Sequence, residues 1–468
     1  MRRTGVVAVF LGAAALTTVP AFAQTDGPFP PDLRAGVDRI AREVLAATGV
    51  PSASLAIVRD GRIAYVEAYG DARLDPRTPA RPGMRYSIGS ISKQFTAAAI
   101  LMLAEERKLS LDDPVSRFAP DLTRANEVTI RQLLSHTSGY QDYWPQDYVP
   151  PVMLKEITTA GILERWARIP LDFEPGTQYQ YSNTNFVIAG LIVEKASGVP
   201  FLEFLRARIF TPLGMTSVAD IDRDRLGQTD PVGYLRYALG PPRPAPKEGK
   251  GWLFAAGELA MTAQDLARWN VALLEQKLLA PASFRELTKD VLLKSGLGTR
   301  YGLGIGVTTE SGRRALEHGG EVSGFTAQNV VFPDDGAAIS VLTNQDSAEA
   351  AGAIARKIAP LLFTKGSSAA ASEARARQVF ESLQRGTIDR SLFTSDANSY
   401  FTEQAVRDFA ASLGPLGKPV SFNQTSQRDR GGMTFHGFEV KFSGKTLAIW
   451  ERDMPDGKIE QFQVMARD

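Results

Sequence analysis

The chain has 468 residues, enough for two or three domains, and its 53 basic and 52 acidic residues leave a formal net charge of +1. Its basic residues are scattered, so the composition does not favour binding to nucleic acid or to a membrane surface. Its 44% apolar content is ordinary for a folded protein, so the composition does not favour disorder either. The chain has no cysteine, which excludes disulfides, thiolate metal sites and a lipid-modified cysteine anchor.

Residues 1–23 have the parts of a secretory signal peptide. Arg2 and Arg3 form a positive start, an apolar stretch follows over 6–16, and Ala21-Phe22-Ala23 is a small-x-small cleavage site before Gln24. The apolar stretch is too short to span a bilayer, and no later segment is long and apolar enough to do so. The sequence therefore predicts an exported, periplasmic protein without a membrane span.

The remaining chain up to about residue 363 predicts an α/β domain over 24–363. A helix over 32–48 precedes two strands, 53–58 and 63–69, joined by the turn residues Arg59-Asp60-Gly61. Helical patterns dominate from there to 274, and a Pro- and Gly-rich loop covers 222–251. Strands over 325–332 and 337–342 and a helix over 348–362 follow. This order predicts one sheet built from both ends of the domain, with a helical block inserted between them.

A linker is predicted over 364–372, followed by a small α+β domain over 373–468. Helices are expected over 373–384 and 403–413, and antiparallel strands over 420–427, 433–442, 447–451 and 459–465. The order of these elements resembles the cone-shaped domains of the nuclear-transport-factor-2-like (NTF2-like) class. We expect this domain to cover the first domain or bind a partner, and we assign no catalysis to it.

Ser90 and Lys93 form an S-x-x-K motif at the start of a strongly apolar predicted helix, 95–106. Residues at i and i+3 of a helix share one face, so the lysine amine can take the proton of the serine hydroxyl. The backbone N–H of a serine at a helix start also points towards an oxyanion that forms there. This motif predicts a nucleophile and its base.

Two further segments complete the constellation required for acyl transfer. Tyr181 provides a phenol that can shuttle a proton, with a pKa that the Lys93 cation would lower, and Asn183 can hold Lys93 and a substrate amide. His318-Gly319-Gly320-Glu321 lies at the start of the strand block, where glycines permit close approach of the backbone to a ligand. Gly320 belongs to this substrate-binding segment, and the N–H of Glu321 would join that of Ser90 as an oxyanion donor.

These three motifs, in this order, resemble the serine penicillin-recognising superfamily, which includes class C β-lactamases, D-Ala-D-Ala carboxypeptidases, D-aminopeptidases and related esterases. The resemblance covers about 32–362. It implies a β-lactamase-like fold, with an antiparallel sheet flanked by helices and an all-helical subdomain. It also implies an acyl-enzyme on Ser90, later hydrolysed by water, and no cofactor or metal. His136 and His436 are expected to be structural.

One departure from the superfamily bears on the substrate. β-Lactamases usually have Lys-Thr-Gly as the third motif, where the charge helps to bind a carboxylate, whereas this chain has His318. We therefore expect hydrolysis of esters or of D-amino-acid peptides and amides, with weak β-lactam hydrolysis at most. If a His318 imidazolium held a substrate carboxylate, affinity for acidic substrates would rise below a pH of about 6.5.

Two other functions remain open from the sequence. A catalytically silent protein that binds peptidoglycan fragments would bind peptides without forming a covalent adduct. An acyltransferase would transfer the acyl group to an acceptor other than water. The sequence does not determine the acyl donor or the oligomeric state.

Overall fold

The computed structural model describes residues 29–144, 146–223, 226–363, 368–430, 433–454 and 457–467. The predicted signal peptide, 1–23, lies outside the described residues, as do positions 364–367 of the predicted linker. We call residues 29–363 the first unit and residues 368–467 the second unit.

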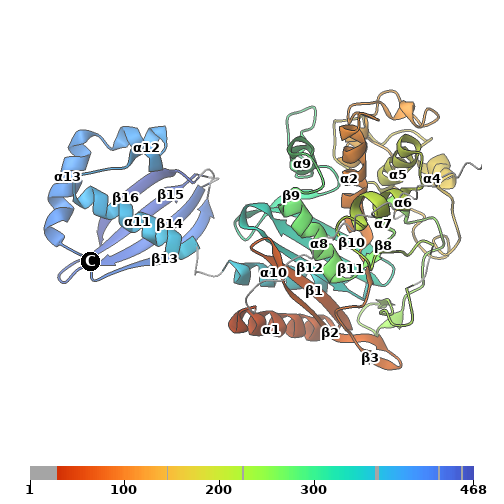
Figure 1. Cartoon of the computed structure of the whole chain (residues 1–468), viewed down its shortest axis with the longest axis horizontal. Coiled ribbons are helices and arrows are strands. Elements are labelled where there is room, and N and C mark those ends of the chain that lie inside the picture. Colours follow the sequence, from red (N-terminus) through yellow and green to blue (C-terminus); the bar gives the residue numbers. More distant parts are fainter. Residues whose placement is uncertain are drawn as a thin grey trace, which may run out of the picture.

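The first unit is built on a seven-stranded antiparallel sheet with the order β3-β2-β1-β12-β11-β10-β9 (Figure 1). Strand β1 pairs with β12, so the beginning and the end of the unit meet in the middle of the sheet, as the sequence predicts. The strands are β1 Ser52–Arg59, β2 Arg62–Leu74, β3 Arg77–Pro79, β9 Gly306–Glu310, β10 Arg313–Val322, β11 Phe325–Phe332 and β12 Ala337–Thr343.

Alternate side chains of the central strands enter two different apolar cores, because successive residues of a strand point to opposite faces. In β1, Leu55 and Ile57 face the core formed with α1 (Pro31–Thr48) and α10 (Ala350–Leu362). Ala56 and Val58 face the core on the other side, where α8 (Ala263–Leu274) packs on the sheet. Both faces are therefore covered, which explains the nearly continuous apolar runs of these strands.

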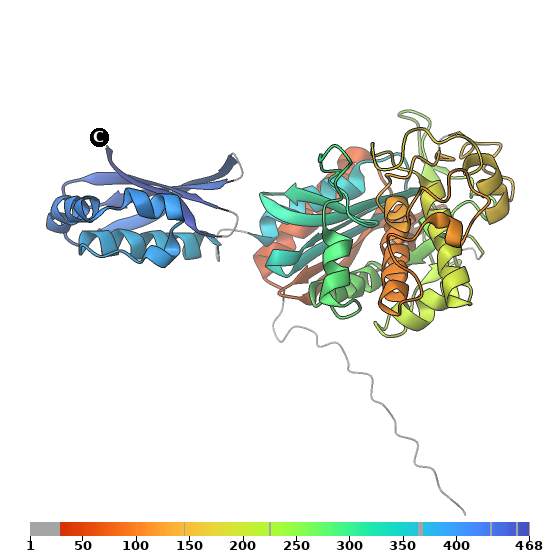
Figure 2. The ribbon, with the colours of Figure 1, turned by 90° about the horizontal axis from the view of Figure 1, so that it is seen from above.

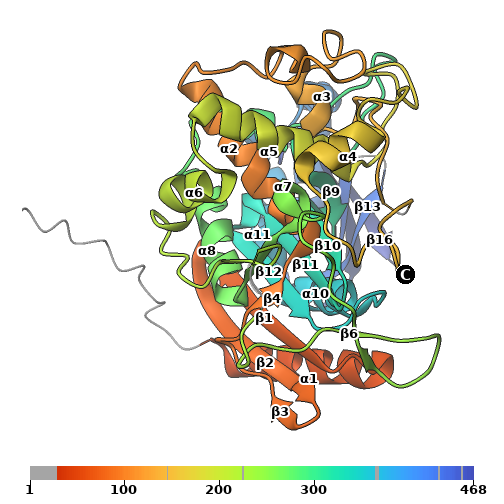
Figure 3. The same ribbon diagram turned by 90° about the vertical axis from the view of Figure 1, so that its right-hand side faces the viewer.

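The helical block lies beyond α8, on the side of the sheet opposite α1 (Figure 3). At its centre α2 packs against α5, and beyond Thr96 the buried residues of α2 are all apolar. The block contains α2 Ser92–Glu105, α3 Ile130–Leu134, α4 Thr159–Trp166, α5 Asn183–Ser197, α6 Phe201–Leu205, α7 Phe254–Gly257 and α9 Pro281–Thr288. The β-lactamase-like arrangement of an antiparallel sheet, flanking helices and a helical subdomain is confirmed.

A small three-stranded sheet fixes the segment that contains Ser90. Strand β4 (Tyr86–Ser87) pairs with β8 (Leu259–Met261), which also pairs with β5 (Ala219–Asp220). Ile88 N then donates to Leu259 O at 3.0 Å, and the chain enters a 3-10 turn over Gly89–Ile91 before α2 begins. Ser90 therefore stands in a turn that is anchored on one side and continued by a buried helix on the other.

The second unit has a four-stranded antiparallel sheet with the order β13-β14-β15-β16 and helices gathered on one face (Figure 2). Its core contains apolar side chains from both layers, among them Phe380, Phe401 and Phe438. This confirms the α+β class, and the NTF2-like resemblance stays a prediction. The elements are α11 Ser368–Gln384, α12 Ser395–Tyr400, α13 Glu403–Leu413, β13 Ser421–Arg430, β14 Met433–Lys441, β15 Thr446–Asp453 and β16 Ile459–Arg467.

Two element boundaries differ from those expected. Helix α5 begins at Asn183, with Ser182 as its N-cap, so Asn183 lies in the first turn of a helix instead of in the loop before it. Helix α11 begins at Ser368, inside the segment predicted as a linker, because its run of alanines has high helix propensity.

Across the described residues, no helix taken singly has the length and apolarity needed to cross a membrane. One bent pair, Asn183–Ser197 with Phe201–Phe210, meets that criterion when its members are taken together.

Gly320 allows β10 to pass directly beside the Ser90 turn, and this contact generates a prediction. A Cβ at position 320 would lie 1.9 Å from the Ile88 carbonyl oxygen, which is backbone and cannot move aside easily. Gly320→Ala should therefore lower the free energy of unfolding by about 1–3 kcal/mol, measured by thermal and denaturant unfolding. Gly319→Ala is the matched control, because the nearest atom to its Cβ would be the flexible end of Gln328, at 3.3 Å, and the Ala327 carbonyl oxygen would be 3.8 Å away, an ordinary contact distance. Equal stability of the two variants would contradict this account.

Candidate active site

Ser90 and Lys93 are in direct contact, as the S-x-x-K spacing predicts. Lys93 Nζ lies 2.9 Å from Ser90 Oγ. Ser90 stands in the 3-10 turn and Lys93 in the first turn of α2, so both side chains project from one continuous right-handed segment. The contact therefore depends on local backbone geometry.

The surroundings of Lys93 favour the neutral amine. Its side chain is completely buried, and Nζ also donates to Asn183 Oδ1 at 2.7 Å and to the Ala256 carbonyl at 2.8 Å. Burial lowers the pKa of Lys93 from 10.5 to about 7, and the charge of Asp142 opposes this shift. At neutral pH, a large fraction of the amine is consequently free to accept the Ser90 proton.

Asn183 reaches Lys93 because Asp142 orients its amide group. The Asp142 carboxylate accepts from the Asn183 backbone N–H at 2.9 Å, and its two oxygens lie 3.2 and 3.3 Å from Asn183 Nδ2. This turns Oδ1 towards Lys93, as expected, but leaves Nδ2 engaged with a carboxylate instead of with a substrate amide. Burial raises the pKa of Asp142 to about 6.

Tyr181 lies beside the Ser90–Lys93 pair, but its pKa does not behave as predicted. Lys93 Nζ lies 5.0 Å from the centre of its ring, and the ring packs on His136 with 4.2 Å between centroids. Burial nevertheless raises the pKa of Tyr181, so the expected lowering by Lys93 is wrong. Desolvation of the phenolate is the largest cause of this rise.

The Tyr181 hydroxyl is buried without a partner. None of the described residues meets hydrogen-bond geometry with it, although the Ser90 hydroxyl is near enough to oppose part of the pKa rise. An unpartnered hydroxyl is costly to bury and is uncommon outside functional sites. Its position next to the nucleophile makes it available to a substrate atom.

His318 lines the same site as a neutral imidazole. Its Nε2 lies 2.8 Å from the Tyr301 hydroxyl, and its Nδ1 contacts the Gly319 carbonyl. The carbonyl accepts from Nδ1–H, so Nε2 accepts from Tyr301. Burial, with a smaller contribution from the Lys93 charge, lowers the pKa of His318 to about 4. Burial therefore disfavours the imidazolium that would hold a substrate carboxylate, and the pH dependence of affinity for acidic substrates stays a prediction.

The edge of β10 beside Ser90 is unpaired within the sheet. Strand β9 pairs with β10 only as far as Glu317, opposite Gly306, whereas β11 pairs with it up to Val322. A Cβ at Gly89 would lie 2.6 Å from Glu321 N, so this backbone nitrogen borders the Ser90 turn. The arrangement suits the predicted oxyanion donors, Ser90 N–H and Glu321 N–H, which stay a prediction.

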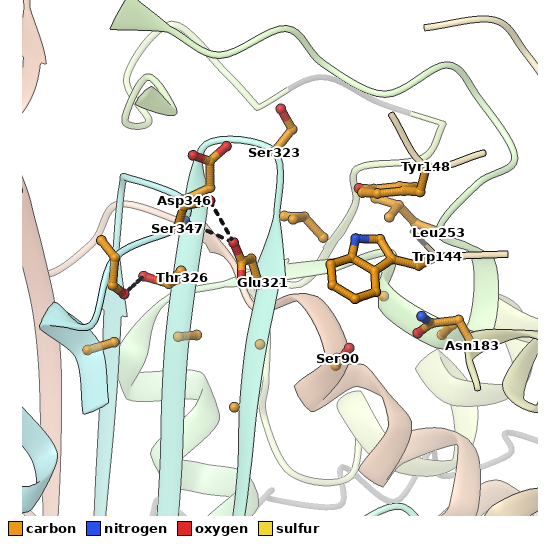
Figure 4. A pocket seen from close by; sticks show the side chains of 18 of the residues that line it. Ser90, Trp144, Tyr148, Asn183, Leu253, Glu321, Ser323, Thr326, Asp346 and Ser347 are labelled. Carbon is orange, nitrogen blue, oxygen red and sulfur yellow. Dashed lines mark hydrogen bonds between the residues drawn. The ribbon is translucent and has the colours of Figure 1, made fainter. Parts of the chain in front are cut away.

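These groups border one cavity of about 820 Å³ (Figure 4). Six of the seven predicted site residues line it, and Lys93 lies beneath Ser90. One wall is apolar and includes Trp144, Tyr148 and Leu253; the other carries the polar groups of Glu321, Asp346 and Ser347. The six lining residues are Ser90, Tyr181, Asn183, His318, Gly320 and Glu321.

Sequence reasoning missed three residues of this site. Asp142 and Trp144 follow the Ser135–Gly139 turn in a loop without periodicity, so no local pattern marked them. Tyr301 lies in a loop, and its bond to His318 depends on the fold. His136 is structural as expected: its Nδ1 accepts from Ser182 N at 3.1 Å. In the described part of the chain, no group of three or more His, Asp or Glu is placed to hold a metal ion.

Comparisons with known proteins agree with this geometry. The chain is 27% identical to protein flp of Staphylococcus aureus over 68% of this chain and 64% of that protein. It is 29% identical to a D-aminopeptidase of Cereibacter sphaeroides over 65% of this chain and 58% of that enzyme. Both alignments span less than two thirds of the relative's length. The solved structure of a D-stereospecific amidohydrolase from Streptomyces superposes on 71% of this chain and 99% of its own, with a TM-score of 0.60 and 28% identity.

The family model described as Beta-lactamase matches residues 37–362, which is most of the chain and contains Ser90, Lys93, Tyr181 and His318. The segment it covers forms the sheet, the helical block and the cavity between them. With an S-x-x-K pair, a buried tyrosine and an open strand edge at one cavity, the chain belongs to the beta-lactamase family.

Proposed function

We propose that this protein is a serine hydrolase that cleaves amides and peptides of D-amino acids through an acyl-enzyme on Ser90. The observation that carries the proposal is the contact between Ser90 Oγ and a buried Lys93 amine whose pKa is near 7. Related proteins with activities on D-amino-acid compounds, such as the D-aminopeptidase and the D-stereospecific amidohydrolase, support the substrate class.

Acylation begins at the Ser90 hydroxyl. The neutral Lys93 amine accepts its proton as Oγ attacks the substrate carbonyl carbon. The carbonyl oxygen becomes an oxyanion between the N–H groups of Ser90 and Glu321, where preorganised donors stabilise it. The ammonium that forms on Lys93 is held by Asn183 Oδ1 and the Ala256 carbonyl.

The leaving amine requires a proton, and Tyr181 is the group placed to supply it. Its hydroxyl is protonated at neutral pH because its pKa is raised, and among the described residues it has no competing partner. Transfer of this proton to the substrate nitrogen accompanies cleavage of the C–N bond and leaves the acyl group on Ser90. The Lys93 ammonium restores the proton of the phenol. Water then attacks the ester carbonyl carbon while the neutral Lys93 amine accepts its proton. The bond between the acyl carbon and Ser90 Oγ breaks, the proton passes from Lys93 to Oγ, and the carboxylic acid leaves.

The first prediction concerns the nucleophile. Ser90→Ala should lower turnover of D-alanine p-nitroanilide by about 10³-fold or more, because no acyl-enzyme forms. Intact-protein mass spectrometry of the wild type during turnover should show one acyl adduct on Ser90, absent from the variant. An unchanged thermal unfolding midpoint serves as the control. Undiminished turnover would reject the mechanism, and substrate binding without any adduct would favour a catalytically silent binding protein.

The second prediction concerns pH. Because Lys93 is active as the free amine, kcat/KM should rise with pH and reach half its plateau near the Lys93 pKa of about 7. The charge of Asp142 raises the Lys93 pKa, so Asp142→Asn should move the midpoint to lower pH. His136 and His318 stay neutral in this range because burial lowers both pKa values. A midpoint that moves to higher pH in Asp142→Asn would contradict this assignment.

The third prediction separates the role of Tyr181 from that of Lys93. Tyr181→Phe keeps the ring that packs on His136 and removes the hydroxyl. Hydrolysis of an unactivated D-amino-acid amide should fall by about 10²–10³-fold, because its leaving nitrogen must be protonated. A p-nitrophenyl ester should lose much less, since nitrophenolate leaves without a proton. The comparison of the two rates is the measurement, and equal losses would remove Tyr181 from leaving-group protonation.

A further inference from the structure

Tyr181 lies in a segment that belongs to no helix or strand. Residues 178–182 have no regular structure, and α5 begins only at Asn183. The Tyr181 hydroxyl has no hydrogen-bond partner among the described residues, so no polar contact at the tip of the side chain holds it. The phenol must therefore be held in place by the backbone on either side of it and by the packing of its ring.

His136 contacts this segment at three points. The Gln180 N–H donates to the His136 carbonyl oxygen at 2.9 Å, and the Ser182 N–H donates to the imidazole Nδ1 at 3.1 Å. The imidazole also packs on the phenol ring, with 4.2 Å between the ring centroids and 31° between the ring planes. One residue thus holds the backbone before Tyr181, the backbone after it, and its ring.

The polar atoms of the imidazole are committed to this contact. Because Nδ1 accepts from a backbone N–H, the ring proton is on Nε2. Within the described part of the chain, Nε2 has no hydrogen-bond partner. The His136 side chain is completely buried, and burial lowers its pKa well below the usual histidine value. A cation stacked on the phenol would lower the pKa of Tyr181, whereas a neutral imidazole leaves the phenol protonated.

The backbone at His136 would suit a smaller residue better. Its φ is +58°, in the left-handed region that glycine and asparagine adopt most readily. His136 directly follows Ser135, the C-cap of α3, where glycine is common. Glycine would fit this backbone, but it would leave the Ser182 N–H without its acceptor and the Tyr181 ring without its neighbour. The histidine provides contacts that the conformationally easier residue lacks.

We infer that His136 is the positioning residue of the proton donor: it holds the Tyr181 segment so that the phenol stays beside Ser90 and Lys93. His136 acts through Tyr181, because it is not one of the residues that line the cavity. The inference rests on the proposed function, in which Tyr181 protonates the leaving nitrogen. Loss of the contact with Ser182 N–H should therefore impair protonation of the leaving group much more than attack by Ser90.

The test uses two variants that both fit the left-handed backbone at position 136. His136→Asn keeps an acceptor for the Ser182 N–H, because Oδ1 of asparagine is separated from Cα by as many bonds as Nδ1 of histidine. His136→Gly removes this acceptor without straining the backbone. Both variants lack the imidazole ring, so the comparison isolates the hydrogen bond to Ser182.

Each full-length variant is assayed with D-alaninamide and with the p-nitrophenyl ester of D-alanine. These substrates have the same acyl group, but only the amide needs a proton on its leaving atom. The ratio of the two kcat/KM values, amide over ester, should fall about tenfold or more in His136→Gly and stay within about threefold of wild type in His136→Asn. Because both rates are measured on one sample, their ratio does not depend on the folded fraction. His136→Ala, which also lacks the acceptor, should show the same fall as His136→Gly.

A second measurement repeats His136→Gly in the Tyr181→Phe background. The hydroxyl that His136 positions is absent there, so the ratio should not fall further. A further fall, equal losses on the two substrates, or equal ratios in His136→Asn and His136→Gly would overturn the inference and leave the proposed function intact. If Tyr181→Phe alone lowers both substrates equally, Tyr181 is not the proton donor and the inference fails with it. Absence of turnover that depends on Ser90 would overturn the proposed function as well.

Discussion

The candidate site depends on the burial of one lysine amine. Lys93 would be a permanent cation in water, and a cation cannot serve as the base for a serine hydroxyl. In this protein the Lys93 amine is buried and forms hydrogen bonds with two oxygen acceptors and with the Ser90 hydroxyl. Asp142 contacts Asn183 instead of the amine. A carboxylate in direct contact would hold the proton on the amine. The amide oxygen of Asn183 is uncharged. It can stabilise the Lys93 ammonium once this forms, but it does not keep the amine protonated before the reaction.

The fold builds this position from elements that are distant in the sequence. The 3-10 turn over Gly89–Ile91 contributes Ser90, and helix α2 contributes Lys93. Helix α5 contributes Asn183, the segment around Ala256 contributes a carbonyl, and β10 contributes the strand edge. Strand β4 ties the Ser90 turn to β8, and the absence of a side chain at Gly320 allows β10 to approach the same turn. These contacts involve backbone atoms, so they hold the Ser90 turn and the edge of β10 together more firmly than flexible side chains would.

The electrostatics of the cavity follow from the same burial. Desolvation disfavours the charged forms of both His318 and Tyr181. Histidine stands in the third motif where β-lactamases usually have lysine, and burial opposes a positive charge on it.

By itself the sequence determined the features that depend on local backbone geometry. Three features follow from spacing, turn residues and element order: the proximity of Ser90 and Lys93, the hairpin of β1 and β2, and the meeting of both ends of the first unit in one sheet. The family resemblance predicted that Tyr181 and His318 belong to the same site as Ser90 and Lys93. Only the tertiary structure decided the protonation states of Lys93, Tyr181 and His318, the role of Asp142, and the bond between Tyr301 and His318. A pKa depends on the solvent and charges that surround a group, and here these surroundings are assembled from helices, loops and strands far apart in the chain.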